Sequence, residues 1–193
     1  IPALIKHAFI SSEDTNFDDH PAYDQRGILA ALVDAIQSRG KRIRGASTIT
    51  QQVMKNFLLD RSRRAERKVK EIILATRIER SLSKEQILEL YLNEIFLGQN
   101  SYGVTAASQT YFNKTLDELA PNEAAFLAAL PKAPSDYHPV REKNRLLERR
   151  NYVLKEMFQN EYLSKEVYEY ELTRPIRSVQ GRDYAGFRSE LPS

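Results

Sequence analysis

Two neighbouring carboxylates, Glu13 and Asp14, are the first side chains of the sequence that could take part in chemistry. They close a segment that also carries Ala8, Phe9 and Ile10. A carboxylate beside apolar side chains is partly desolvated, which moves a carboxyl pKa upwards, towards the range that suits a general base. Solvated carboxylates at helix ends are nevertheless more common than catalytic ones, so the pair alone does not identify a reaction.

A polar block follows between Gly45 and Gln52. Gly45 permits a close turn, and Ser47 or Thr48 is a natural N-cap for a helix, whose free amide groups can bind an anion. A well-capped helix would explain these residues without any function. The adjacent glutamines Gln51 and Gln52 are not needed for capping, however, and their amides suit the recognition of hydroxyl groups and sugars.

A basic run extends from Lys55 to Lys70 and contains seven Lys or Arg against two acids. Such a run is compatible with a solvated helix face or with a nucleic-acid-binding patch. The apolar triplet 57–59 within it is more typical of a surface that meets anionic lipid headgroups. Acid, hydroxyl–amide block and cations in this order indicate a site that activates a hydroxyl group and holds an anionic leaving group.

Another carboxylate, Glu71, lies one helical turn after Lys68 and one turn before Ala75. The same row continues to Ile78 and Leu82, so we expect Glu71 to be half buried and paired with a cation. It is either part of a structural ion pair or a second carboxylate that faces the first.

The composition limits the kinds of site that the chain can form. Its 193 residues suffice for one large domain or two small lobes with an ordinary core. The absence of cysteine excludes disulfides, zinc–cysteine sites and thiol nucleophiles, and the three histidines have no second ligand at metal-binding spacing. No apolar run approaches the roughly 20 residues of a membrane span. Because the first residue is Ile1 rather than Met, we expect the chain to be a segment of a longer protein.

The apolar periodicity predicts an all-α protein. Helices are expected over residues 3–14, 25–37, 48–59, 64–82, 83–98, 102–112, 121–130, 141–159 and 164–173. A capping box is predicted at Thr115-x-x-Glu118, and Pro121 should be the first residue of its helix.

The helix expected over residues 83–98 has signals at both ends. A capping box at Ser83-x-x-Gln86 should start it, and Gly98 should end it. Its inward stripe should consist of Ile87, Leu88, Tyr91, Leu92 and Ile95.

Five blocks of the sequence match the motifs of a known family when they are taken together. The blocks are Glu13-Asp14-x-x-Phe17-x-x-His20, Gly45-x-Ser47-Thr48-x-x-Gln51-Gln52 with Lys55-Asn56, Arg67-Lys68-x-x-Glu71, Lys84-x-x-Ile87-x-x-x-Tyr91-x-Asn93, and Arg149-Arg150-x-x-Val153-Leu154-x-x-Met157. In this order they resemble the peptidoglycan glycosyltransferase domain (glycosyltransferase family 51) of class A penicillin-binding proteins.

The resemblance implies that lipid II is polymerised into β-1,4-linked glycan strands, with inversion at the anomeric carbon and release of polyprenyl diphosphate. Glu13 would be the general base, and Glu71 a second catalytic carboxylate that positions the acceptor or a diphosphate-bound cation. Lys55 and Arg63 would hold the donor diphosphate. The other substrate-binding residues that the resemblance implies are Asp14, Phe17, His20, Gly45, Ser47, Thr48, Gln51, Gln52, Asn56, Arg67, Lys68, Tyr91 and Asn93. No cofactor and no protein-held metal would be required, and a magnesium or manganese ion on the diphosphate is compatible with this chemistry.

The resemblance also implies an architecture and a location. The fold would be an all-α, two-lobed, lysozyme-like domain over residues 1–173, with a small membrane-contacting lobe near residues 30–62. Residues 174–193 would form a linker toward a covalently joined transpeptidase domain. An N-terminal transmembrane helix would anchor the protein at the periplasmic face of the bacterial inner membrane. Its partners there would be lipid II, the growing lipid-linked glycan chain and the membrane, and no nucleic acid.

Two other functions remain open at this point. A muramidase or lytic transglycosylase of lysozyme-like fold would also use a catalytic glutamate, but it would not need the basic run because no diphosphate leaves. A basic helical module that binds nucleic acid would explain the cations, but it would explain neither Glu13 nor the polar block from Gly45 to Gln52.

Overall fold

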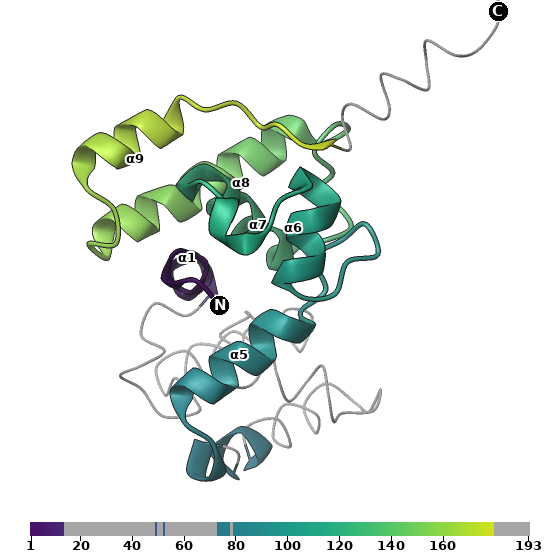
Figure 1. The fold of residues 1–193 in the computed structure, drawn as a ribbon, viewed down its shortest axis with the longest axis vertical. Helices are drawn as coiled ribbons and strands as arrows, with labels where there is room; N and C mark the ends of the chain where they lie inside the picture. Colours follow the sequence, from purple (N-terminus) through teal and green to yellow (C-terminus); the bar gives the residue numbers. More distant parts are fainter. Residues whose placement is uncertain (14–48, 50–51, 53–72, 78, 180–193) are drawn as a thin grey trace, which may run out of the picture. The chain divides into compact units, whose positions relative to one another are not determined.

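The computed structural model describes residues 1–13, 49, 52, 73–77 and 79–179. The longer elements in these ranges are all α-helices (Figure 1). They are α1 (Ala3–Glu13), α5 (Lys84–Glu94), α6 (Val104–Phe112), α7 (Pro121–Ala129), α8 (Lys143–Gln159) and α9 (Lys165–Leu172). Residues 73–77 and 79–81 are also helical. The described part further contains two short 3-10 turns, Leu116–Glu118 and Leu130–Lys132, and one isolated β-bridge between Phe96 and Tyr102. The predicted all-α class is confirmed for the described residues.

The chain divides into two compact units. One consists of Ile1–Thr15 together with Leu92–Ser193, and the other of Asn16–Tyr91. The lobe expected near residues 30–62 falls in the second unit, almost entirely outside the described residues. The helix expected over residues 25–37 also lies outside them. In the part of the chain that the structure describes, no helix has both the length and the apolar character of a membrane span.

Helix α7 forms the centre of the first unit. Six consecutive residues of α7, from Ala124 to Ala129, are buried, as expected for a helix that is apolar on all sides. It packs against both α1 and α8, and α1 also packs against α8. Figure 1 shows these three helices together, with α1 seen along its axis. The end of α1 is therefore held by two other helices.

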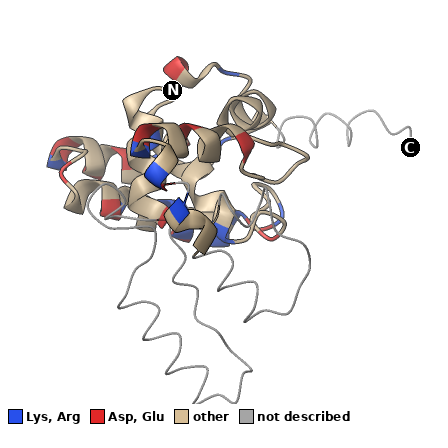
Figure 2. Ribbon diagram, turned by 90° about the horizontal axis from the view of Figure 1, so that it is seen from below, with Lys and Arg blue, Asp and Glu red and all other residues tan. Residues whose placement is uncertain are grey.

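Helix α8 buries one stripe, whereas α1 buries Ile5 and then four consecutive residues, from Ala8 to Ser11. In α1, Ile5, Ala8 and Phe9 have no exposed surface, and their spacing of three and four residues puts them on one face. In α8 the same periodicity buries Leu146, Val153, Leu154 and Met157. Outside these stripes the described helices carry both acidic and basic residues (Figure 2).

Local signals set several helix starts. The amide of Ser83 donates to Oε1 of Gln86, and the amide of Gln86 donates to Oγ of Ser83, so the predicted capping box before α5 is confirmed. All five residues of the predicted inward stripe are buried as well: Ile87, Leu88, Tyr91, Leu92 and Ile95. The amide of Thr115 donates to Glu118, but this box precedes only a 3-10 turn. Pro121 is the first residue of α7, as predicted.

The predicted end of α5 at Gly98 is wrong. The helix ends at Glu94, and Gly98, with φ of 77°, lies in the turn that follows. The next helix also begins two residues later than the predicted residue 102, at Val104. Gly103 precedes it with φ of 84°, and an added Cβ there would overlap the carbonyl group of Asn93. Only glycine fits this approach of backbone to backbone.

Candidate active site

Glu13 is the last residue of α1. The packing of this helix against α7 and α8 buries Ser11 and leaves Ser12 and Glu13 at the edge of the core. The side chain of Glu13 is 13% exposed. The predicted base therefore occupies a largely enclosed position that is held by helix packing.

The structure brings Arg149 of α8 to this carboxylate. Nη2 of Arg149 lies 3.9 Å from Oε1 of Glu13 and donates to Oγ of Ser12 at 3.3 Å. The hydroxyl group of Ser12 lies 3.2 Å from Oε1 of Glu13 and 2.7 Å from the carbonyl oxygen of Ala128 in α7. Glu13, Ser12 and Arg149 thus form one polar cluster at the junction of α1, α7 and α8.

The guanidinium group of Arg149 is itself enclosed. Its side chain is 14% exposed, and its Cζ atom lies 4.6 Å from the ring centre of Tyr152, one helical turn further along α8. The ring face attracts the cation and limits its movement. Within the described part of the chain, the buried Nε of Arg149 has no hydrogen-bond partner.

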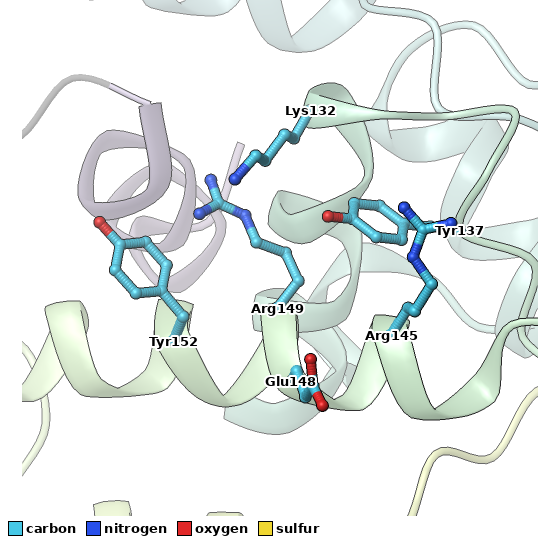
Figure 3. A pocket seen from close by; sticks show the side chains of 6 residues that line it. All are labelled: Lys132, Tyr137, Arg145, Glu148, Arg149 and Tyr152. Atoms are coloured by element: carbon cyan, nitrogen blue, oxygen red, sulfur yellow. The ribbon is translucent and has the colours of Figure 1, made fainter.

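A pocket of about 450 Å³ adjoins this cluster (Figure 3). It is lined by Lys132, Tyr137, Arg145, Glu148, Arg149 and Tyr152. Three of these side chains are cationic and one is acidic, so the lining favours an anion. One arginine side chain can bind two phosphate oxygens at once, and a lysine side chain acts as a point charge. Figure 3 shows Lys132 and Arg149 pointing toward one another across the pocket.

None of the pocket residues was predicted as a site residue, and Arg149 entered the sequence analysis only as part of the fifth block. The spacing of Arg145, Glu148, Arg149 and Tyr152 is three, one and three residues, which places all four on one face of a helix. That spacing is the signal in the sequence that could have revealed the lining of α8. Lys132 comes from the 3-10 turn after α7, and no local pattern connects it to α8.

The second arginine of the fifth block has a different role. Arg150 is completely buried; its Nη1 donates to the carbonyl oxygen of Arg174 at 2.6 Å, and its Nε and Nη2 donate to Oδ1 of Asn151. Burial lowers the pKa of Arg150, and the charge of Glu171 opposes this shift. Glu171 is buried too and accepts from the backbone and side-chain amides of Asn122. These contacts tie α7, α8 and α9 together.

Four of the predicted site residues fall within the described ranges. Glu13 belongs to the cluster described above; Gln52 is half buried, Tyr91 is buried and Asn93 is exposed. The burial of Tyr91 follows from its place on the inward stripe of α5. The predicted residues that lie outside the described ranges are Asp14, Phe17, His20, Gly45, Ser47, Thr48, Gln51, Lys55, Asn56, Arg63, Arg67, Lys68 and Glu71. Their roles stay predictions.

Residues 1–158 match the family model described as "Transglycosylase". Penicillin-binding protein 1A of Rickettsia felis is 49% identical over 178 residues, which are 91% of this chain and 22% of that protein. The proteins of the same name from Haemophilus influenzae and Escherichia coli are 49% and 46% identical over 91% and 92% of the chain.

A crystal structure of penicillin-binding protein 1A from Haemophilus influenzae matches 67% of this chain and 16% of that chain, with 42% identity and a TM-score of 0.48. The chain spans about a fifth of the length of the curated relatives above, 20–22%. The family predicted from the five sequence blocks is confirmed. By the match over residues 1–158 and these identities, the chain belongs to the transglycosylase family.

Proposed function

We propose that the chain is a peptidoglycan glycosyltransferase, which polymerises lipid II into β-1,4-linked glycan strands. Membership of the transglycosylase family and the name of its relatives, penicillin-binding protein 1A, support this proposal. The observation that carries it is the enclosed carboxylate of Glu13 beside Arg149, at the edge of a basic pocket.

The reaction needs a base for a sugar hydroxyl group. Glu13 takes the proton of the acceptor's 4-hydroxyl group while that oxygen attacks the anomeric carbon of the donor, and the bond to the diphosphate breaks with inversion. The geometry corresponds to that of an inverting glycosidase, with a sugar hydroxyl group in place of water. Polyprenyl diphosphate leaves as a weakly basic anion, so cations can stabilise it and no protonating acid is needed.

The basic pocket fits the anionic part of such a substrate. Lys132, Arg145 and Arg149 offer three cations to phosphate oxygens, and Tyr152 places an aromatic face beside them. On the donor side, Lys55 and Arg63 are proposed to hold the diphosphate and Glu71 to act as the second carboxylate. No cofactor is required, and a magnesium or manganese ion is proposed to bind, if at all, through the diphosphate itself.

The location follows from the substrate. Lipid II is held in a membrane, so the chain is proposed to work at the periplasmic face of the bacterial inner membrane. There it would belong to a longer protein with an N-terminal transmembrane anchor and a penicillin-binding transpeptidase domain. Its partners are lipid II, the growing lipid-linked glycan chain and the membrane.

Polymerisation of lipid II by the wild type and by Glu13→Gln tests the proposal. Loss of the general base should reduce the rate about 10²- to 10⁴-fold, because glutamine cannot accept the proton. Glu169→Gln is the matched control: it makes the same chemical change on α9, at a side chain that is 62% exposed, and should leave the rate unchanged. Equal rates for wild type and Glu13→Gln would refute the assignment of the base. Release of short sugars without polymer would favour the muramidase or lytic transglycosylase instead.

A further inference from the structure

Ser12 contacts both charged groups of the candidate active site, Glu13 and Arg149, but has no role of its own in the proposed reaction. Its Oγ atom is 3.2 Å from Oε1 of Glu13 and 2.7 Å from the carbonyl oxygen of Ala128. It also accepts a hydrogen bond of 3.3 Å from Nη2 of Arg149. One hydroxyl group therefore contacts α7, α8 and the carboxylate at the end of its own helix.

The number of hydrogen atoms decides what this hydroxyl group can do. A serine hydroxyl has one hydrogen to donate and two lone pairs, and an arginine guanidinium only donates. Arg149 therefore occupies one lone pair of Ser12. The single hydrogen can point either to the carboxylate of Glu13 or to the carbonyl oxygen of Ala128, which lies in the last turn of α7, where helix carbonyls lack intrahelical partners.

These two rotamers correspond to the two states of a general base. While Glu13 is a carboxylate, it accepts hydrogen bonds only, and the hydroxyl group of Ser12 can donate to it. Once Glu13 has taken the substrate proton, its carboxyl group becomes a donor as well. Ser12 can then accept from Glu13 and donate to Ala128, so that no polar group of the cluster loses its partner during proton transfer.

Ser12 also determines how Arg149 approaches the base. Nη2 of Arg149 lies 3.3 Å from Oγ and 3.4 Å from the backbone oxygen of Ser12, but 3.9 Å from Oε1 of Glu13. The last distance is too long for a hydrogen bond. The guanidinium group therefore supplies positive charge near the carboxylate while its Nη2 donates to Ser12.

We propose that Ser12 is a positioning residue, which holds the guanidinium group of Arg149 and orients the carboxylate of Glu13 for proton transfer. The proposal rests on the proposed function, since it assigns Ser12 to the same reaction. It identifies a role for a hydroxyl group whose contacts are with Glu13, Ala128 and Arg149.

The chain offers a matched control in the preceding residue. Ser11 is 2% exposed and accepts a hydrogen bond from Nδ2 of Asn160 at 3.1 Å. Ser11→Ala removes the same atom from the same helix and breaks a contact between distant parts of the chain. The hydrogen bond of the Ser11 hydroxyl group leads to Asn160 and to neither Glu13 nor Arg149. A loss caused only by weaker packing of α1 should appear in both alanine variants.

The first test measures kcat and KM for lipid II polymerisation by the full chain. Ser12→Ala should lower kcat about 10- to 100-fold, because a hydrogen bond to a charged group is lost, and should change KM less than about threefold. Ser12→Thr keeps the hydroxyl group and should recover most of the rate, and Ser11→Ala should stay near the wild type. In an Arg149→Gln background the further effect of Ser12→Ala should shrink, because the two residues act together. Equal losses in Ser11→Ala and Ser12→Ala, or full activity of Ser12→Ala, would overturn the proposal.

The second test does not depend on activity. The guanidinium signals of Arg149 in a nitrogen–proton NMR spectrum can be assigned by their absence in Arg149→Lys. They should shift and broaden in Ser12→Ala and remain as in the wild type in Ser11→Ala and Ser12→Thr. Unchanged signals in Ser12→Ala would overturn the positioning of Arg149. If the wild type made no glycan strands, the proposed function would fail, and these spectra would still decide whether Ser12 holds Arg149.

Discussion

Arg149 and Arg150 are adjacent in the sequence, yet their side chains have different partners on different sides of α8. Nη2 of Arg149 lies 3.9 Å from Oε1 of Glu13, whereas Nη1 of Arg150 donates a 2.6 Å hydrogen bond to the carbonyl oxygen of Arg174. Successive side chains of an α-helix are turned by about 100° from one another, and here the turn carries Arg149 to α1 and Arg150 to the segment after α9. One arginine is therefore available to a reaction and the other to the packing of the fold.

Replacement of the buried arginine should destabilise the protein. Arg150→Met leaves the carbonyl oxygen of Arg174 without this donor. It also removes the positive charge that the negative charge of Glu171 favours. The free energy of unfolding should fall by about 1–3 kcal/mol, as is usual when a buried acceptor loses its hydrogen-bond donor. Urea denaturation measures this loss. Arg145→Met, at an exposed position of the same helix, is the control and should stay within about 0.5 kcal/mol of the wild type. Equal stability of the two variants would contradict the structural role of Arg150.

Replacement of the neighbouring arginine should instead affect catalysis. Arg149→Gln removes the cation near Glu13 and one of the three cations of the pocket. We expect kcat/KM for lipid II to fall about 10- to 100-fold, mostly through kcat. Arg145→Gln, which lines the same pocket, should act mainly by raising KM. The two variants would show the same division between kcat and KM if the contact of Arg149 with Glu13 had no catalytic consequence.

The stability of the protein should depend on pH through His7. Burial, with a smaller effect of Lys6, lowers the pKa of His7, whose ring stacks on Tyr162 at 4.0 Å. The folded state binds this proton less tightly than the unfolded state. The stabilisation is therefore complete above the unfolded pKa of about 6.5 and is lost as the pH falls through the lowered value in the folded state.

His7→Phe keeps an aromatic ring against Tyr162 and removes the titration. On acidification from about pH 7.5 to about pH 5.5, the melting temperature of the wild type should fall further than that of His7→Phe. The pKa of His138 is lowered as well, but His138 titrates in both proteins, so their difference isolates His7. An equal fall in the melting temperature of the wild type and of His7→Phe would exclude this contribution of His7.

Gly103 should tolerate no side chain. Its φ of 84° and ψ of 157° belong to a region that only glycine occupies readily, so Gly103→Ala should cost about 2 kcal/mol or more. The overlap with the carbonyl group of Asn93 adds to this cost. Asn113→Ala provides a comparison: Asn113 has φ of 52° and ψ of 42°, a left-handed conformation that costs an L residue about 1–2 kcal/mol. Thermal unfolding measures the loss of stability in each variant. A smaller loss for Gly103→Ala than for Asn113→Ala would contradict the predicted strain at Gly103.

The local structure of the described part could largely be predicted from neighbouring residues. The capping box of Ser83 and Gln86, the first helical position of Pro121 and the buried stripe of α5 depend on contacts within one or two helical turns. The end of α5 could not be placed in this way. Gly98 is required by its approach to Pro134 and Tyr111, which come from later in the chain, and not by the end of a helix.

The candidate site also has a part that the sequence predicts and a part that depends on tertiary contacts. The sequence by itself determined the family and led to the proposal of Glu13 as the base, because motif residues and their order are properties of the chain alone. Only the tertiary structure decided that Arg149 and not Arg150 meets Glu13, and that Lys132 joins Arg145 around a pocket. Those contacts depend on how α1, α7 and α8 pack together, and the packing is set by apolar stripes that lie far apart in sequence.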